Sequence, residues 1–556
     1  MDMRIKVEET RDNHETININ GYYLHSKFEP IKEAKKIAEK NYRPHHLHVI
    51  FGYGMGYIVE ELSRLCKFNE PILLVDPLID KGVLQLKDYS SRRIYYISMK
   101  SLEAIENLAD TLSSYTTNII FLSSINYANI LPKEALTIAK LIKDVQYKQL
   151  VNINTSNHYS MQWQLNYILN LNNIENDYSL SILEKKYNCP VVIASSGPSL
   201  NKQLPLLKLY RDKLLLVCAG STINALIAEG IEPDYVVSVD GGEANKKQFA
   251  NVHLKYGQLI YDPMSHHDIR KHFGDKAFVF MPHIYKELKD HFREIFHRDF
   301  PIILGGGSVA HFALSIAKYI TSGPICLIGQ DLALTNNQSH AEGSKYIERH
   351  EQGEMQVRGY NEEKVQTNRS FNTMINTFNE LQIFDPHESE IFNCTEGGAK
   401  LEQYKQCSFK KFLNDFCKER VFLENNLFEE RSSKFFSLDK EFEKYYKILD
   451  YLIKGKNLAE KEPGPIFSNK AIIELGEIEK NLNILYKETC LDILLEPNIV
   501  FAEHQFLPAV NETKEQEFIR VRSYIIQLYT ICLESIEEYI ANLKQLLKRE
   551  TEHERN

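Results

Sequence analysis

The strongest constraint on the fold comes from residues 190–200, PVVIASSGPSL. The β-branched run at 191–193 is typical of a strand buried in a parallel sheet. The small residues 195–197 allow a tight turn, and Pro198 suits the first turn of a helix, where Ser199 follows. A strand, a glycine turn and a helix N-terminus place several backbone N–H groups around one point, which suits a phosphate. An ordinary turn between strand and helix, without a ligand, is the alternative.

Composition narrows the class of protein. The 556 residues predict three or four domains, and the net charge of −9 argues against a nucleic-acid binder. The nine cysteines form no CxxC pair, which favours reduced thiols in a cytoplasmic protein. The charged start, MDMRIKVEETRDN, is not typical of a secretory signal, and glycines and charges interrupt the apolar segment 302–320, which predicts no membrane span.

The N-terminal part, residues 1–155, reads as a Rossmann-like domain. A strand at 49–51 leads into Gly52, Gly54 and Gly56, then a helix, then the strand PILLVDP, which ends in Asp76. This order of strand, glycine turn, helix, strand and acid is typical of a nucleotide-binding unit. The third glycine comes two residues after the second rather than three, so we expect a degenerate or empty site.

Polar and small residues follow several strands predicted in a second α/β domain, residues 156–405. Gly220 and Ser221 follow the strand at 214–217, Asp240 follows PDYVVSV, and Gln330 and Asp331 follow the strand at 325–328. The stretch GGGSVAHFALSIA supplies a second glycine turn before a helix, with Ser308 at its start. Because the carboxyl ends of parallel strands bind ligands in α/β sheets, these residues predict one site at one edge of a sheet.

Two further segments could carry function. His266, His267 and Asp268 are consecutive, but adjacent histidines are expected to point to opposite sides, and spacing places no third ligand. We therefore predict no metal site. Residues 345–370 are charged and aperiodic and predict a flap over the ligand edge.

Residues 406–556 are predicted to be helical. Apolar residues recur at spacings of three and four between Thr513 and Lys548, which defines one buried helical stripe. This domain is either a partner-binding platform or a structural cap. The predicted fold class is therefore α/β, with a Rossmann-like N-terminal domain, a Rossmann-like central domain and an α-helical C-terminal domain.

Several motifs together resemble one known family. In order they are GPSL, PDYVVSVD, GGSVAHFALSIA, GQDLALTNNQSHAEG and TEGGAK, preceded by LHSKFEP, IFGYGMGYIVEEL and LLVDP. This set, over residues 20–400, resembles the motility accessory factor (Maf) family of flagellin glycosyltransferases. The central domain is also similar, more distantly, to bacterial sialyltransferases. Two departures stand out. Asp76 occupies a position where the Maf family is expected to have Glu. A sialyltransferase would have its catalytic histidine late in the central domain, but no histidine occurs between His387 and His504.

The resemblance implies transfer of a nonulosonic acid, of the pseudaminic or legionaminic type, from its CMP donor to Ser or Thr hydroxyls of flagellin in the cytoplasm. It implies no obligatory metal or other cofactor, because a monophosphate donor carries no diphosphate to neutralise. His340 and Asp331 are the candidates for the general base. The residues expected to bind the donor are Ser196, Gly197, Pro198, Ser199, Gly220, Ser221, Asp240, Gly307, Ser308, Gln330, Glu396 and Lys400.

Two other functions remain open from the sequence. Archaeal enzymes that form pterin diphosphates resemble the same central domain, and such an enzyme would use ATP with Mg²⁺, which needs a pair of carboxylates. Asp240 and Asp331 could supply that pair. The third possibility is a non-catalytic factor that binds flagellin through the helical C-terminal part.

Overall fold

The computed structural model describes residues 4–67, 70–89, 93–113, 118–274, 277–285, 288–334, 338, 340, 353, 355–361, 363–423, 427, 436–508 and 512–554. The chain forms two compact units. The first contains Met1–His158, Leu452–Glu477 and Glu496–Leu533; the second contains Tyr159–Tyr451, Ile478–Leu495 and Glu534–Asn556. The division into domains at 1–155, 156–405 and 406–556 stays a prediction.

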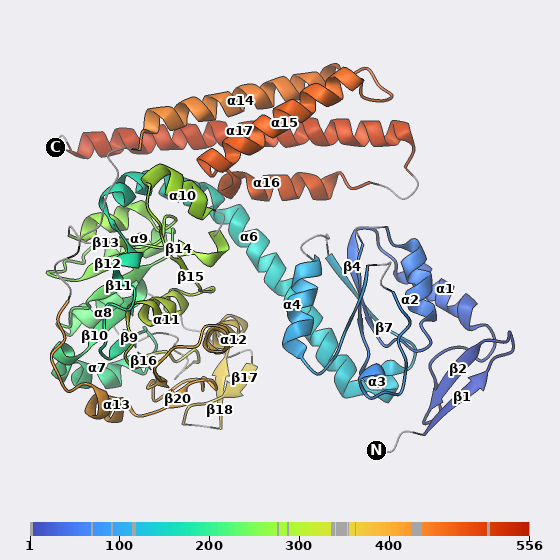
Figure 1. The fold of residues 1–556 in the computed structure, drawn as a ribbon, viewed down its shortest axis with the longest axis horizontal. Helices are drawn as coiled ribbons and strands as arrows, with labels where there is room; N and C mark the ends of the chain where they lie inside the picture. Colours follow the sequence, from blue (N-terminus) through green and yellow to red (C-terminus); the bar gives the residue numbers. More distant parts are fainter. Residues whose placement is uncertain are drawn as a thin grey trace. The chain divides into compact units, whose positions relative to one another are not determined.

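The first unit is built around a four-stranded parallel sheet in the order β6-β5-β4-β7. All four residues of β5 are buried, as expected for an apolar strand covered on both faces. A small antiparallel sheet, β1-β2-β3, precedes it (Figure 1). The elements are β1 (Ile5–Glu9), β2 (Glu15–Ile19), β3 (Tyr22–Tyr23), α1 (Pro30–Asn41), β4 (His46–Phe51), α2 (Tyr57–Leu65), β5 (Ile72–Val75), α3 (Pro77–Asp80), β6 (Ile94–Ile97), α4 (Leu102–Ser113), β7 (Asn118–Ser123) and α5 (Tyr127–Ile130).

Helix α6 (Pro132–Asn176) is 45 residues long and runs from the first unit into the second. From the sequence alone, we predict a helix from Pro132 to about Leu150 and a separate helical segment over residues 155–185. The structure joins them, because neither glycine nor proline occurs after Pro132 in this segment. Pro132 itself stands at the first helical position, where its missing N–H costs nothing.

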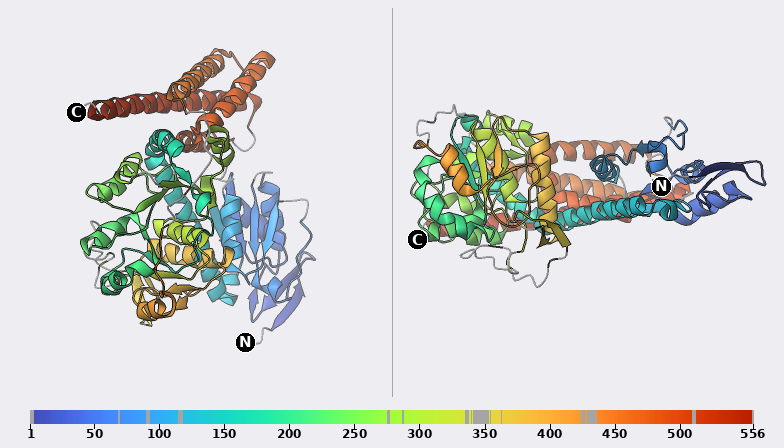
Figure 2. Two further views of the ribbon diagram at one scale, coloured as in Figure 1. Left: turned by 60° about the vertical axis from the view of Figure 1, so that its left-hand side comes forward. Right: turned by 90° about the horizontal axis from the view of Figure 1, so that it is seen from below.

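The second unit contains a nine-stranded sheet in the order β20-β19-β16-β9-β10-β11-β12-β13-β8, with every neighbouring pair parallel. Figure 2 gives two further views of its strands and flanking helices. The elements are β8 (Tyr178–Ser179), η1 (Leu180–Leu183), β9 (Val191–Ala194), α7 (Leu200–Leu209), η2 (Arg211–Lys213), β10 (Leu215–Ala219), η3 (Gly220–Thr222), α8 (Ile223–Ala228), β11 (Tyr235–Ser238), α9 (Glu243–Phe249), β12 (Gln258–Tyr261), η4 (His267–His272), β13 (Ala277–Val279), β14 (Met281–Pro282), η5 (His283–Tyr285), α10 (Leu288–Phe296), β15 (Ile302–Ile303), α11 (Val309–Ile320), β16 (Ile325–Ile328), β17 (Met355–Arg358), β18 (Lys364–Thr367), α12 (Arg369–Phe384), β19 (Ile391–Asn393), β20 (Lys405–Gln406) and α13 (Phe409–Phe416).

Strand β9, the predicted opening strand, lies at the point where the strand order reverses. From β9 the chain proceeds outward through β10, β11, β12 and β13, and later returns to place β16 on the other side of β9. Helix α11 packs across β9, β10 and β11 before the chain enters β16. In open α/β sheets, ligands bind at the carboxyl ends of the strands where the order reverses, so this topology points to the ends of β9 and β16.

Residues 355–367 lie in the segment 345–370, whose aperiodic sequence did not indicate regular structure. They contain the antiparallel pair β17–β18, in which Val357 lies opposite Val365. Both valines pack against the core of the second unit. Two four-residue strands among charged residues give too short an alternation to be read from sequence.

The C-terminal part is helical, as expected, with α14 (Leu438–Lys461), α15 (Asn469–Thr489), α16 (Asp492–Gln505) and α17 (Lys514–Glu554). Parallel α/β sheets followed by helices confirm the predicted fold class. Among the described residues, no helix combines the length and apolar character needed to cross a membrane.

Candidate functional site

The site begins where the ends of β9 and β16 meet. Asp331, just after β16, accepts a hydrogen bond from the Ser199 hydroxyl to its Oδ2 over 2.7 Å. The Ser199 N–H donates to the same carboxylate, at 3.2 Å to Oδ2. Ser199 is the residue before α7, so the carboxylate lies at the N-terminal end of that helix. The N–H expected to bind a donor phosphate through Ser199 is therefore occupied by the chain's own acid.

Glycines allow this close approach. A Cβ on Gly197 would lie 2.1 Å from Asp331 Oδ2, and a Cβ on Gly398 would lie 2.2 Å from the Asp331 carbonyl oxygen. Gly398 and Gly329 also have positive φ angles, of 65° and 64°, which favour glycine. A Cβ on Gly397 would lie 3.3 Å from Ser199 Cβ and 3.4 Å from Asp331 Oδ1. The predicted turns GPSL, GQD and TEGGAK thus come together around one carboxylate.

The Asp331 carboxylate is almost completely buried, and burial raises its pKa from 3.8 to about 6. The two hydrogen bonds from Ser199 act in the opposite direction, because they stabilise the ionised form. A carboxylate with a pKa near neutrality is chemically suited to accept a proton in catalysis. The same contacts also suit a helix cap, the structural alternative for this residue.

Hydroxyl and amide groups join the neighbouring strand ends. Ser196 Oγ lies 3.1 Å from Ser221 Oγ, which links the end of β9 to the end of β10. Ser195 Oγ donates to Gln330 Oε1 over 2.6 Å and so links β9 to β16. The Gln330 N–H donates to Thr395 Oγ1, beyond β19. Ser196 and Ser221 therefore supply two adjacent hydroxyls at the expected donor edge.

Asp240 follows β11 and is exposed. Its Oδ1 accepts the Gly242 N–H over 2.8 Å, while Oδ2 has no partner among the residues that the structure describes. Asn245 fixes the backbone here by donating to the Asp240 carbonyl oxygen. Asn166, from α6, holds the next residue by donating to the Gly241 carbonyl oxygen. Asp240 thus presents one carboxylate oxygen outward from a fixed loop.

The sequence reasoning missed a second acid at this edge. Asp262 follows β12, the neighbour of β11, and accepts the Ser265 N–H and hydroxyl on Oδ1, both at 2.8 Å. Complete burial raises its pKa to about 7, and the nearby Asp240 charge acts in the same direction. The segment YDP, an acid directly after a predicted strand, was the available signal.

Four other predicted residues are less central to this cluster. Ser308 caps α11 by accepting the Ala310 N–H, and Gly307 is exposed. Among the described contacts, none joins Gly307 or Ser308 to Ser199 or Asp331. Glu396 accepts the Phe409 N–H at the start of α13, and Lys400 pairs with Glu402. Their roles in binding the donor stay predictions.

His340, the other candidate base, is half-buried. Around it, residues 339 and 341–352 lie outside the described part of the chain, so its role also stays a prediction. The same applies to most of the expected flap, of which only 353, 355–361 and 363–370 are described.

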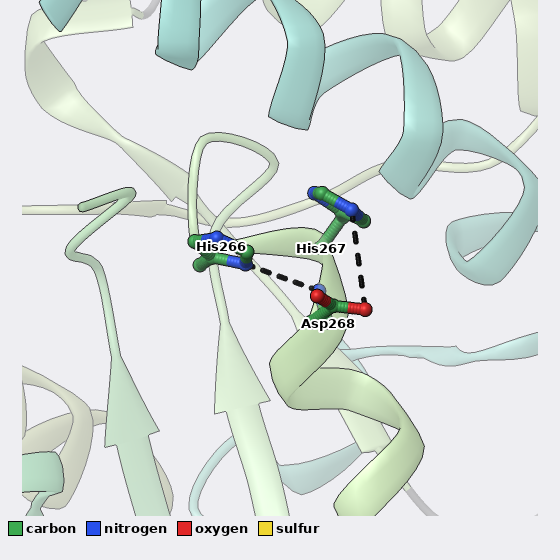
Figure 3. A group of neighbouring side chains, drawn as sticks. All are labelled: His266, His267 and Asp268. Atoms are coloured by element: carbon green, nitrogen blue, oxygen red, sulfur yellow. Dashed lines mark hydrogen bonds and ion pairs between the residues drawn. The ribbon is translucent and has the colours of Figure 1, made fainter. Parts of the chain in front are cut away.

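His266, His267 and Asp268 are closer together than expected (Figure 3). The two imidazole rings stack with centroids 4.8 Å apart, so the expectation that they point to opposite sides is wrong. The backbone turns into η4 at this point, which brings the rings to the same side. The ligand atoms lie within 4.8 Å of one another.

Each candidate ligand in this group already has a protein partner. His266 Nε2 lies 3.0 Å from Glu243 Oε1, and His267 Nδ1 lies 3.0 Å from Asn166 Oδ1. Asp268 pairs at 2.6 Å with two lysines, Lys246 and Lys271. Two ammonium groups on the only carboxylate of the group oppose a metal cation. The contacts therefore favour a structural role.

In the first unit, the turn Gly52–Gly56 is filled by the chain itself. Tyr127 Oη accepts the Gly54 N–H over 2.9 Å and donates to Asp76 over 2.6 Å. His25 Nε2 accepts the Met55 N–H. A phosphate placed on this turn would have to displace these groups, which agrees with the expectation of a degenerate or empty site.

Comparisons with known proteins bear on the fold of the chain. A family model described as 6-hydroxymethylpterin diphosphokinase MptE-like matches residues 165–337. A solved structure described as a MAf glycosyltransferase, from Magnetospirillum magneticum AMB-1, is similar with a TM-score of 0.58 at 15% identity. The similarity covers 99% of this chain and 95% of that one. No curated protein matches the chain.

Proposed function

We propose that this chain, which shares the fold of a MAf glycosyltransferase across nearly its whole length, is itself a glycosyltransferase. Its donor would be a CMP-activated nonulosonic acid, of the pseudaminic or legionaminic type, and its acceptor the Ser and Thr hydroxyls of flagellin. The observation that carries the proposal is the 99% coverage of the fold, because it includes the flanking parts as well as the central sheet. The residues at the ends of β9, β10, β11 and β16 would bind the donor and accept the proton of the acceptor hydroxyl.

The reaction exchanges one bond for another. The acceptor hydroxyl oxygen attacks the anomeric carbon, the bond from that carbon to the phosphate oxygen breaks, and its electron pair leaves with CMP. Ser196 and Ser221 would donate hydrogen bonds to the phosphate, since their hydroxyls are adjacent at the strand ends. Asp331, or alternatively His340, would take the proton of the acceptor hydroxyl. In this proposal no metal is needed, because a single phosphate leaves.

Thermal stability of the full chain with CMP, and separately with ATP and Mg²⁺, tests the proposal. A ligand present at a hundred times its Kd raises the free energy of unfolding by about 2.7 kcal/mol. We expect CMP to raise the Tm and ATP with Mg²⁺ to leave it unchanged. A chain that responds to neither would instead favour the non-catalytic role in binding flagellin.

The second candidate is a pterin-type diphosphokinase, which the match to the MptE-like family model favours. Its Mg²⁺ would need neighbouring carboxylates, and Asp240 and Asp331 were the expected pair. Strands β9 and β10 lie between β16 and β11, which separates these strand ends by about 14 Å. Asp331 is also held at α7 by Ser199. The carboxylate of Asp331 is thus already engaged by the chain itself, which disfavours it as a ligand of an ion shared with Asp240. A rise in Tm with ATP and Mg²⁺ alone would favour this candidate.

A further inference from the structure

Two aromatic side chains of α6 lie against the Asp240 loop. Tyr159 and Trp163 stack with ring centroids 5.9 Å apart and 22° between their planes. Tyr159 is 37% exposed, although it is a large aromatic residue. One turn separates the two residues along α6, so the stacked pair forms one aromatic surface.

Two glycines bring the loop close to these rings. A Cβ on Gly241 would lie 3.0 Å from Trp163 Cδ1. A Cβ on Gly242 would lie 3.7 Å from Tyr159 Cε1 and 3.1 Å from Asp240 Oδ1. The Tyr159 ring and the Asp240 carboxylate therefore both lie next to the position that a side chain at Gly242 would occupy.

The loop is held in this position by hydrogen bonds from both sides. Asn166, one turn after Trp163 on α6, donates to the carbonyl oxygens of Gly241 and Met264. Asn245 donates to the Asp240 carbonyl oxygen from α9. A preformed site of this kind loses little entropy when a ligand binds.

We propose that Tyr159, Trp163 and Asp240 form a subsite for a sugar ring that carries neighbouring hydroxyls. The aromatic surface packs against the apolar face of the ring, and the free Oδ2 of Asp240 accepts hydrogen bonds from its hydroxyls. The inference rests on the proposed function. It extends that function by assigning α6 to ligand recognition.

The position fits a donor that extends along the strand ends. Strands β9 and β11 are separated by β10, so their ends lie about 10 Å apart. A phosphate held by Ser196 and Ser221 would be at the ends of β9 and β10. A ring attached to that phosphate reaches the end of β11. This ring is either the ribose of the nucleotide or the transferred sugar.

Titration calorimetry with two probes and the full chain distinguishes whether the subsite binds the ribose or the transferred sugar. The probes are CMP and CMP-N-acetylneuraminic acid, which share the ribose but differ in the second sugar. The variants are Tyr159→Ala and Gly242→Ala. Gly242 has φ −77° and ψ 153°, which alanine adopts without backbone strain, and its methyl group would lie against the Asp240 carboxylate and the Tyr159 ring. Tyr147→Ala, at an exposed tyrosine of the same helix, is the matched control.

We expect both variants to weaken binding of CMP-N-acetylneuraminic acid at least about 10-fold, which is the range for losing one buried aromatic contact and a hydrogen bond. Unchanged binding of CMP assigns the subsite to the transferred sugar, and equal weakening of both probes assigns it to ribose. Wild-type affinity for both probes in both variants would overturn the subsite and leave the proposed function standing. A wild-type chain that binds neither probe would overturn both.

Discussion

Asp331 accepts hydrogen bonds from both the N–H and the hydroxyl of Ser199, although 132 positions separate the two residues in the chain. This contact joins the end of β16 to the start of α7 at the point where the strand order reverses. In the turn that the sequence predicts to bind a phosphate, the N–H and the hydroxyl of Ser199 thus already donate to the carboxylate of Asp331. That arrangement leads to different expectations for Asp331, for Ser199 and for the neighbouring serines.

Replacing Asp331 with Asn should remove a pH dependence of stability. Burial raises the pKa of Asp331 from 3.8 to about 6, so between these values the folded state binds more protons than the unfolded state. Stability from this group is therefore lost as the pH rises from about 4 to about 6, by up to about 3 kcal/mol. Urea unfolding at pH 4.5 and 7.5 should show this loss in the wild type and a smaller one in Asp331→Asn. Parallel pH dependences in the two proteins would contradict the assignment.

If Asp331 is the general base, transfer should depend on its ionisation. The rate should rise with pH through about 6, because only the carboxylate accepts the proton. Asp331→Asn should then lower kcat by about 10²-fold or more. A pH–rate profile of His340→Ala is the comparison. Loss of the rise near pH 6 in His340→Ala, with activity retained in Asp331→Asn, would transfer the role to His340.

The serines at the strand ends should differ in their effect on nucleotide binding. Ser196→Ala and Ser221→Ala should each raise the Kd for CMP by roughly 3- to 10-fold, the cost of one hydrogen bond. Ser199→Ala should leave that Kd unchanged, since the Ser199 groups donate to Asp331. Calorimetry on the three variants tests the difference. A stronger effect at Ser199 than at Ser196 would mean that a phosphate displaces the acid.

In the first unit, Tyr127→Phe should destabilise the fold and leave CMP binding unchanged. The Tyr127 hydroxyl donates to the buried Asp76 and accepts the Gly54 N–H. Its loss leaves both groups without that partner and should lower the free energy of unfolding by about 1–3 kcal/mol. Urea unfolding and a CMP titration of the same sample check both parts. Weaker CMP binding in a folded variant would place a nucleotide at the glycine turn.

Transfer should survive removal of divalent cations. The proposed reaction releases a monophosphate, and the carboxylate of Asp331 already accepts the hydrogen bonds of Ser199. Dialysis of the enzyme against EDTA, followed by a rate measurement, should give an unchanged kcat. Recovery of a lost rate by added Mg²⁺ would contradict this expectation.

Local sequence was enough to predict the longer strands of the central sheet and the turns after them, but not the two-residue strands β8 and β20. The apolar run before Ser195 forms β9, and Asp240 follows the end of β11, as expected. Helix α6 and the pair β17–β18 differed from expectation, because a long polar helix and two short charged strands carry weak periodicity.

Local sequence could not predict which side chains contact one another across the fold. Nothing near Asp331 indicates that Ser199 satisfies it, because the contact depends on how β16 is placed beside β9. The positions of Tyr159 and Trp163 against Gly242 and Gly241 were equally out of reach, because they are set by the packing of segments that are distant in the sequence.

The most direct test of the account is transfer itself. The purified chain would be incubated with a CMP-activated nonulosonic acid and unmodified flagellin, and the intact mass of flagellin measured. The account predicts an increase by one or more nonulosonic acid residues, with one CMP released for each. Unchanged flagellin mass with both pseudaminic and legionaminic donors, from a folded chain that binds CMP, would contradict it.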